Sequence, residues 1–269
     1  MGTSSSFDGL TNGSPLLPPW AQDEVIENPD DNEEQDEIPE SLSGSWQSAK
    51  SLMTRYVNSS GDTEKLKQSA RSYVQARGGA TGASRAAISG KNAASNLGNF
   101  FSGVINQGIE RTLESYGLHH IIGDSVENVF MAIAESLSPK GDSIENSIAR
   151  QATIDTLAFV YDKYEFEDYN IEKFNSMKED DIREVLELCI ESYIYERWLQ
   201  ELGIRIEKNA ISEKQAIRLE MDVKDLVKSS ISFDFQDYDL LNINFKDGAG
   251  KSIIDNIYKQ AYTQLEVIE

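Results

Sequence analysis

The sequence predicts an all-α protein that carries a long disordered acidic tail at its N-terminus. Apolar residues recur at helical spacing through most of residues 46–269, whereas residues 1–45 hold eleven acidic residues and no Lys or Arg. Residues 46–118 hold nine basic and four acidic residues, and residues 119–269 hold sixteen basic and thirty-one acidic. We therefore expect a tail over 1–45, a basic Gly/Ala-rich helical segment over 46–118 and an acidic helical domain over 119–269.

Residues 1–45 contain five of the six prolines, and their acidic run over 30–37 offers almost nothing apolar to bury. Ordering a residue costs about 1–2 kcal/mol, which this composition cannot offset by burial. The exception is a compact apolar run made of Pro15, Leu16, Leu17, Pro18, Pro19 and Trp20. This run is either a docking segment for a partner, because stiff residues lose little entropy on binding, or an apolar piece of linker.

Two helices are expected at the start of the middle segment. Trp46, Met53 and Val57 recur at helical spacing, and Asp62 is placed to cap a second helix that ends near Gly78. A stretch rich in Gly, Ala and Ser follows, with a helical apolar stripe towards residue 109.

The same segment contains a basic window over 65–91 in which no acidic residue occurs. Its basic residues are Lys65, Lys67, Arg71, Arg77, Arg85 and Lys91. One interpretation is structural, because the glycines permit close approach of helices and flexible joints. The other is a basic surface for a phosphate, a nucleic acid or an acidic protein, including the chain's own tail.

The acidic domain is expected to contain several capped helices. Asp124 is placed to cap a helix that ends at Ser138, and Asp142 with Glu145 has the spacing of a capping box. A long helix is expected over 178–202, stopped by Gly203; it is apolar on much of its circumference and therefore central.

The remaining elements are a further helix, a non-helical stretch and a last helix. Ser212 with Gln215 predicts a capping box at the start of the first of these. Apolar residues alternate with period two over 231–245, which predicts a short β-hairpin or an extended loop. The last helix is expected to start at a turn around Asp247.

Candidate catalytic motifs are few. Residues 248–252 imitate the end of a phosphate-binding loop, but Phe245 stands where a Walker A loop has glycine. The adjacent His119 and His120 point apart on a regular element, and Cys189 lies among apolar neighbours as a core thiol. We therefore expect no enzymatic activity, no cofactor and no metal.

Composition also narrows the partners and the compartment. A single cysteine excludes an internal disulfide framework, and a net charge of −21 argues against general affinity for nucleic acids. No run of 18 apolar residues and no secretory signal are present, so we expect a cytoplasmic protein without membrane contact.

The N-terminus is the most specific feature. It consists of Met1, Gly2, Thr3, Ser4, Ser5 and Ser6. Removal of Met1 would leave Gly2 with a free α-amine, whose pKa lies near 8, so that a usable fraction is unprotonated at neutral pH. The pattern also fits N-myristoylation, but one acyl chain beside eleven acidic residues would bind an anionic membrane poorly.

This N-terminal string, followed by Gly9, Gly13 and the apolar run at 15–20, resembles the start of the QatB family of the bacterial Qat antiphage defence system. The resemblance covers about twenty residues and the overall layout of the chain. It implies a non-enzymatic partner of an ATPase (QatA), a QueC-like enzyme (QatC) and a TatD-like nuclease (QatD). By analogy with related systems, it implies that Gly2 accepts a deazaguanine from the QueC-like enzyme, with Thr3 to Ser6 and the 15–20 run bound to that partner.

Two alternatives remain open. The 65–91 window could make the protein a nucleic-acid-binding adaptor for the nuclease, a role that predicts binding that falls steeply with salt. The second alternative is a plain scaffold, in which the helical domain joins partners and the tail is a tether.

Overall fold

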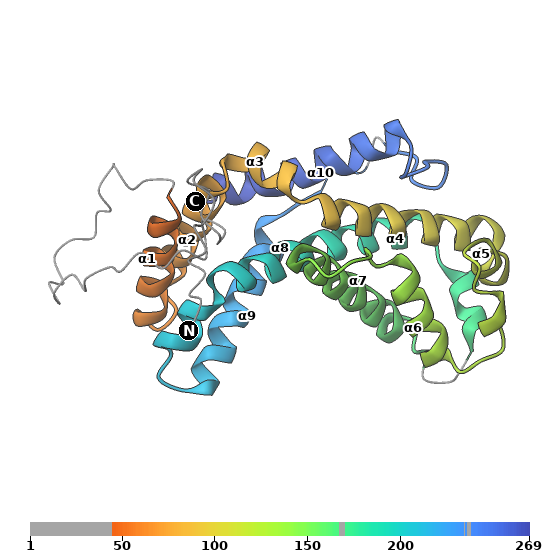
Figure 1. The fold of residues 1–269 in the computed structure, drawn as a ribbon, viewed down its shortest axis with the longest axis horizontal. Coiled ribbons are helices and arrows are strands. Elements are labelled where there is room, and N and C mark those ends of the chain that lie inside the picture. The colour runs from red at the N-terminus through yellow and green to blue at the C-terminus, as the bar shows by residue number, and fades with distance from the viewer. Residues whose placement is uncertain (1–44, 167–169, 234, 236–237) are drawn as a thin grey trace, which may run out of the picture.

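The fold is known from a computed structural model that describes residues 45–166, 170–233, 235 and 238–269 (Figure 1). The predicted tail, Gly2 and the apolar run at 15–20 lie outside these residues. Within the described residues every regular element is a helix and none is a strand, which confirms the all-α class.

The described helices follow one another in short connections. They are α1 (Trp46–Asn58), α2 (Thr63–Ala76), α3 (Gly79–Ala86), α4 (Ile88–Gln107), α5 (Ile109–Ser115), α6 (Val126–Leu137), α7 (Ile144–Lys163), α8 (Glu179–Asn209), α9 (Glu213–Ser230) and α10 (Gly248–Glu266). Short 3-10 helices, η3 (His119–Ile121) and η5 (Ile171–Ser176), lie between them. A bilayer-spanning helix, which needs about 20 mostly apolar residues, is not found among them.

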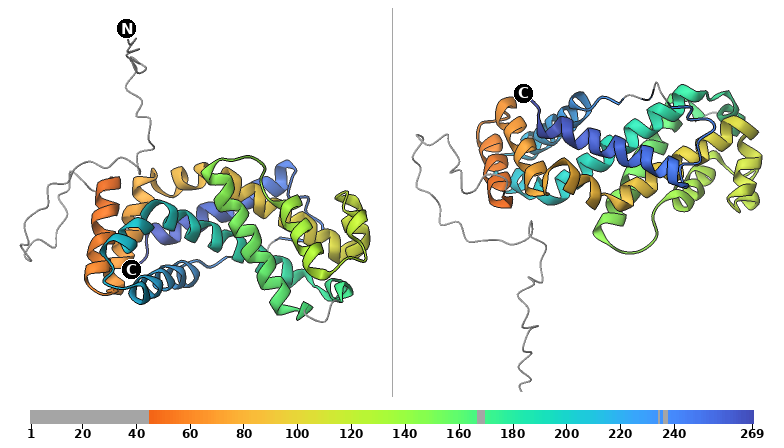
Figure 2. Two further views of the ribbon diagram at one scale, coloured as in Figure 1. Left: turned by 60° about the horizontal axis from the view of Figure 1, so that its bottom comes forward. Right: turned by 90° about the horizontal axis from the view of Figure 1, so that it is seen from above.

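Helix α8 is the centre of the molecule. It packs against α1, α4, α7 and α9, while α10 packs along α2, α3 and α4. The views in Figures 1 and 2 show an elongated body with α1 and α2 at one end and α5 and α6 at the other. Helices from both sides of residue 118 contribute to one cluster of buried residues, and the predicted domain boundary at that residue stays a prediction.

The central position of α8 agrees with the sequence, but its predicted end does not. The helix runs six residues beyond Gly203, to Asn209. Glycine costs about 1 kcal/mol in a helix relative to alanine. The extension buries Ile206 completely, and this burial favours the continued helix.

Of three predicted N-caps, one is confirmed and two are shifted by one residue. Asp62 caps α2, as expected, and accepts hydrogen bonds from two backbone amides of the first turn. Ser125 and Ser143, rather than Asp124 and Asp142, cap α6 and α7, because each serine hydroxyl accepts from the backbone amide three residues later.

The expected capping box of α9 forms only in part. Ser212 accepts a hydrogen bond from the backbone N–H of Gln215. The Gln215 side chain accepts from the backbone N–H of Ile211, at 2.8 Å, instead of the N-cap residue's own amide. The predicted turn before α10 is confirmed, because the Asp247 side chain accepts from the backbone N–H of Gly250.

The hairpin alternative over 231–245 is wrong: the described residues of this stretch contain no strand and form an extended loop. Helix side chains bind its backbone where a partner strand would. Gln264 of α10 binds the backbone N–H and C=O of Ser232 at 2.7 and 2.9 Å, and Asn99 of α4 accepts from the N–H of Phe245 at 2.9 Å. The period-two pattern therefore reports alternate burial in a loop that lies against helices.

Glycines of α4 allow other elements to approach its backbone. A Cβ at Gly90 would lie 2.5 Å from the Tyr258 hydroxyl and 2.7 Å from the Tyr193 ring, and one at Gly98 would lie 2.8 Å from the Phe245 ring. These distances support the structural interpretation of the Gly-rich stretch, in which small residues admit large aromatic neighbours.

Substitution of Gly90 by Ala is expected to reduce the free energy of unfolding by about 1–3 kcal/mol, because the added methyl overlaps the Tyr193 ring. Gly203→Ala is the matched control: its Cβ meets only Leu199 at 3.7 Å, an ordinary contact. That variant is expected to gain about 0.5–1 kcal/mol from helix propensity. Urea unfolding of both variants measures the difference, and a Gly90→Ala protein as stable as the parent would contradict the packing account.

Candidate functional site

The predicted modification and docking residues lie outside the described part of the chain. They are Gly2, Thr3, Ser4, Ser5, Ser6, Pro15, Leu16, Leu17, Pro18, Pro19 and Trp20. Their roles therefore stay predictions, and the described residues supply the body to which they are joined.

Two cations of the basic window, Arg77 and Lys91, form ion pairs with carboxylates from distant parts of the chain. Arg77, the C-cap residue of α2, forms two bonds to the Glu201 carboxylate at 2.5 and 2.7 Å, and both side chains are about 95% buried. Lys91 of α4 pairs with Asp255 of α10 at 2.7 Å. Both carboxylates come from the acidic part of the chain, residues 119–269. The basic and acidic regions of the sequence therefore pair with each other, at least in part, in the folded protein.

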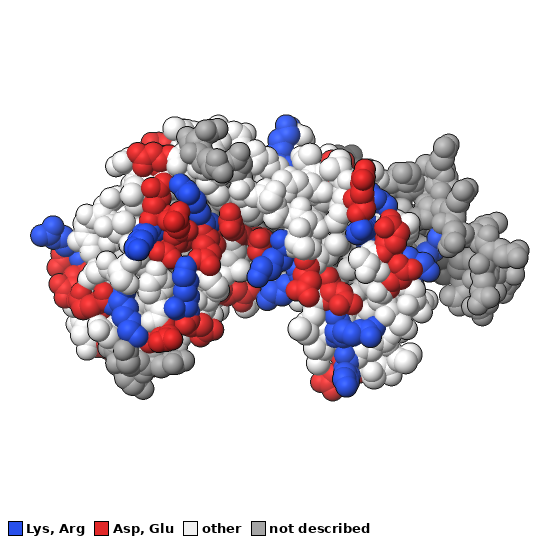
Figure 3. Space-filling view, turned by 180° about the vertical axis from the view of Figure 1, so that it is seen from behind, with Lys and Arg blue, Asp and Glu red and all other residues white. Residues whose placement is uncertain are grey.

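The remaining window residues are divided between α2 and α3. Lys67 and Arg71 lie one turn apart and share Glu64, at 3.9 and 3.3 Å. Lys65 and Arg85 form no ion pair among the described residues. Lys and Arg side chains are also interspersed with Asp and Glu on the face shown in Figure 3. Binding of nucleic acid by this window stays a prediction, and internal pairing reduces the charge available for it.

The other residues singled out by sequence have structural surroundings. Both His119 and His120 are exposed in η3. Cys189 is fully buried, and burial raises the pKa of its thiol to about 12. Among the described residues, no group of three or more His, Cys, Asp or Glu side chains could hold a metal ion.

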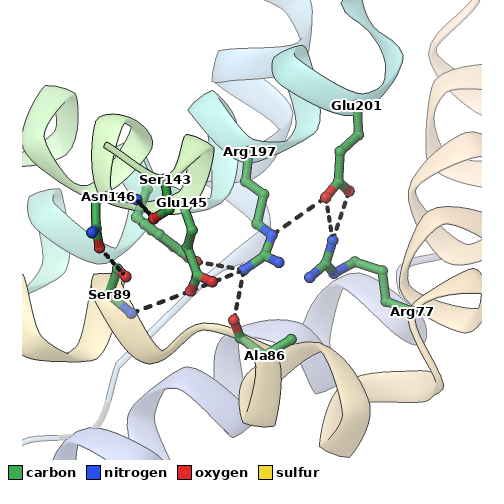
Figure 4. A network of polar contacts seen from close by, with 9 residues as sticks. Arg77, Ala86, Ser89, Ser143, Glu145, Asn146, Arg197 and Glu201 are labelled. Carbon is green, nitrogen blue, oxygen red and sulfur yellow. Dashed lines mark hydrogen bonds and ion pairs between the residues drawn. The ribbon is translucent and has the colours of Figure 1, made fainter. Parts of the chain in front are cut away.

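A largely buried network of charged and polar residues joins α2, α3, α4, α7 and α8 at the centre of the molecule (Figure 4). Its core is Glu201 of α8, which accepts from Arg77 and also from the Nε of Arg197 at 3.4 Å. Arg197 in turn donates to the Ala86 carbonyl at the end of α3, at 3.0 Å. One carboxylate thus joins the ends of α2 and α3 to the middle of α8.

The network continues into α4 and α7 through Glu145. This carboxylate accepts from the Tyr193 hydroxyl at 3.0 Å and from the backbone N–H of Ser89 at 3.2 Å, and lies 3.6 Å from the Arg197 guanidinium. The Ser89 hydroxyl donates to the side-chain oxygen of Asn146 at 2.7 Å. Glu145, expected to complete a capping box, is instead the residue through which α7 is attached to α4 and α8.

A groove lies between α7 and α8, and two of its lining residues adjoin network residues in the sequence. It has a volume of about 500 Å3, and its lining residues are Asp142, Ile144, Ser147, Ile148, Gln151, Glu196, Leu199 and Gln200. Ile144 and Glu196 directly neighbour Glu145 and Arg197 in sequence, so the network positions both walls. We call these eight residues the α7–α8 groove.

Unusual carboxyl groups line α8 beside this groove. Burial raises the pKa of Glu196, and the nearby Asp155 carboxylate raises it further, while Lys224 opposes the shift. Burial likewise raises the pKa of Glu220 on α9, and the Glu207 carboxylate adds to it. Asp155 is held by hydrogen bonds from Ser192 at 2.5 Å and Gln151 at 2.7 Å.

Further along α8, burial raises the pKa of Glu191 to about 7, with the Glu187 charge adding to the shift and Lys228 opposing it. Burial also raises the pKa of Glu187, next to Glu184. Among the described residues, the four carboxyl groups with raised pKa values all lie on α8 or α9. Clusters of perturbed groups beside a groove are typical of functional sites.

Sequence reasoning did not find this site. Glu196 and Leu199 belong to the long central helix, and only the approach of α7, some fifty residues earlier in the chain, brings Ile144 and Asp142 to them. One signal was available: Glu187, Glu191 and Glu196 interrupt a helix that is apolar on most sides, which places carboxylates at half-buried positions.

The described residues thus define an all-helical protein with a charged network at its centre and a groove on its surface. A family model described as "QatB: Qat anti-phage system associated protein QatB" matches residues 78–265, from the start of α3 almost to the end of α10. The chain therefore belongs to the QatB family and is a component of the Qat antiphage system. The matched region excludes the N-terminal residues that carried the resemblance, so the two observations are independent. Curated proteins and solved structures gave no match.

The raised pKa of Glu191 makes a test of its burial possible. Between its ordinary value of about 4.3 and its folded value, the folded protein binds more protons than the unfolded chain, so stability falls as pH rises through this window. Glu191→Gln removes this loss. The variant is expected to melt at the parent's temperature at pH 4 and above it at pH 8, as measured by thermal unfolding.

The matched control is Glu135→Gln on α6, where the carboxylate is exposed. Its melting temperature relative to the parent is expected to change little between the two pH values. An equal shift for Glu191→Gln at pH 4 and pH 8 would show that the carboxyl group titrates normally in the folded protein.

Proposed function

We propose that the protein is a non-catalytic subunit of the Qat system, acting in the cytoplasm, and that the α-amine of Gly2 accepts a deazaguanine acyl group from the QueC-like partner. The observation that carries this proposal is the string from Met1 to Ser6. Family membership supports the coarser role in defence, and the conjugation step is the finer proposal.

The chemistry requires an amine nucleophile. A QueC-like enzyme uses ATP to convert the carboxylate of its deazaguanine substrate into an acyl adenylate, which ordinarily reacts with ammonia. In the proposed step the unprotonated Gly2 nitrogen forms a bond to the acyl carbon, the bond from that carbon to the phosphate oxygen breaks, and AMP leaves. The nitrogen loses one proton to solvent or to a partner base, which leaves an amide.

Glycine and its neighbours suit this role. Gly2 has no side chain to hinder approach to the acyl carbon, and Thr3 to Ser6 carry small side chains that fit a narrow channel. With a pKa near 8, a fraction of the α-amine is neutral at pH 7 without assistance from another residue.

Two features support delivery of this amine to a partner: the length of chain before the first described helix, and the firm packing of that helix against the body. The described helices begin at Trp46, and the forty or so residues before it span at most about 150 Å when fully extended. Helix α1 is held by its buried face, including Met53 and Tyr56, against α2 and α8. Gly2 can therefore reach a partner's active site while the helical body binds elsewhere in the complex, including to the QatA ATPase or the QatD nuclease.

Co-expression with the QueC-like partner tests the proposal. The intact mass of the protein is expected to show loss of Met1 and a gain of one deazaguanine acyl group on Gly2. Gly2→Leu, which retains Met1, is expected to abolish both the gain and antiphage protection, whereas Gly9→Leu in the same tail leaves both intact. An unmodified Gly2 in an actively protecting strain would contradict the proposal.

A further inference from the structure

The α7–α8 groove combines an apolar floor with two carboxylates, those of Asp142 and Glu196, that form no ion pair among the described residues. We propose that it binds a basic amphipathic segment of a partner protein, with one apolar side chain of that segment against Ile144 and Leu199 and its cationic side chains beside Asp142 and Glu196. This inference concerns the helical body and is independent of the reaction at Gly2.

The apolar part of the groove is unusually exposed for its residue types. Ile144, the first residue of α7, is 52% exposed, while Ile148 one turn later is 8% exposed and Leu199 of α8 is half-buried. An apolar side chain that fills the space between α7 and α8 would cover the free face of Ile144. Burial of one such side chain removes apolar surface from water on both partners, which suits a single anchor residue.

The charged part of the groove lacks partners within the chain. No ion pair among the described residues engages Asp142 or Glu196. The charges that act on Glu196 are Asp155 of α7 and Lys224 and Glu220 of α9. Lys224 also lies 5.6 Å from the centre of the Tyr195 ring, so its charge is shared with that ring. Carboxylates outnumber cations among these groups, so the groove has a negative potential that favours a cationic segment.

Charge selects among the candidate occupants. The chain's own tail holds eleven acidic residues and neither Lys nor Arg, so the groove repels it. A second copy carries a net charge of −21, and nucleic acids are polyanions, so both are disfavoured on the same ground. A basic protein segment with an apolar anchor matches both halves of the groove.

The test uses a labelled 14-residue helical peptide of Leu and Lys as the probe and the full chain as the binder, with fluorescence anisotropy as the readout. Two further peptides separate the contributions, one with Glu in place of Lys and one with Ser in place of Leu. Only the Leu/Lys peptide is expected to bind strongly, because the groove requires both cations and an apolar anchor.

Variants with equal charge then locate the binding. Asp142→Asn with Glu196→Gln is expected to weaken binding at least about tenfold, a loss of about 1.4 kcal/mol. Glu114→Gln with Glu135→Gln removes the same charge from exposed positions on α5 and α6 and is expected to weaken it less than about twofold. Ile144→Ser is expected to weaken binding, whereas Met131→Ser, at a 70% exposed position on α6, does not.

Several results would overturn the proposal. Equal weakening by the two double variants would mean diffuse attraction to an acidic protein. A dimer seen by sedimentation and lost in Ile144→Ser would assign the groove to a second copy. Binding of a labelled peptide of residues 15–31 to the parent but not to Ile144→Ser would assign it to the chain's own tail.

Discussion

The paired bonds from Arg77 to Glu201 are the interaction on which the rest of the molecule depends. They lie almost wholly out of water, where an unpaired charge is strongly destabilising, so α2 can end only where its guanidinium meets α8. Arg197 and Glu145 extend the same network to α3, α4 and α7. A few charged groups thereby link five helices to one another.

The same network connects the fold to the proposed binding surface. Glu145 and Arg197 face the core, while the adjoining Ile144 and Glu196 face the α7–α8 groove. Any displacement of α7 along α8 would break the inner contacts and change the shape of the groove together. The outer carboxylates can remain without partners because the inner ones hold the helices in place. The two proposed functions thus fall on different parts of the chain, conjugation on Gly2 and protein recognition on the α7–α8 groove.

Local features of the fold were predictable from sequence, and long-range ones were not. Helical spacing located the central helix. The cap at Asp62 and the helix-starting turn at Asp247 were predictable because such features depend on three or four neighbouring residues. Glu145 was assigned to a cap by its spacing, yet its partners are Tyr193 and Ser89, each about fifty residues away. The loop over 231–245 was ambiguous for a similar reason, since its backbone is bound by side chains of α4 and α10. The groove depends on how α7 lies against α8, which no local pattern encodes.

The coupling between Arg77 and Glu201 tests this account most directly. The free energy of unfolding is measured for the parent, Arg77→Met, Glu201→Met and the double variant. Each single change is expected to cost about 3–5 kcal/mol, and the double variant at least about 2 kcal/mol less than their sum. The pair of Lys91 with Asp255, whose carboxylate is exposed, should couple by less than about 1 kcal/mol. Additive losses at Arg77 and Glu201, within about 0.5 kcal/mol, would contradict the claim that this pair organises the fold.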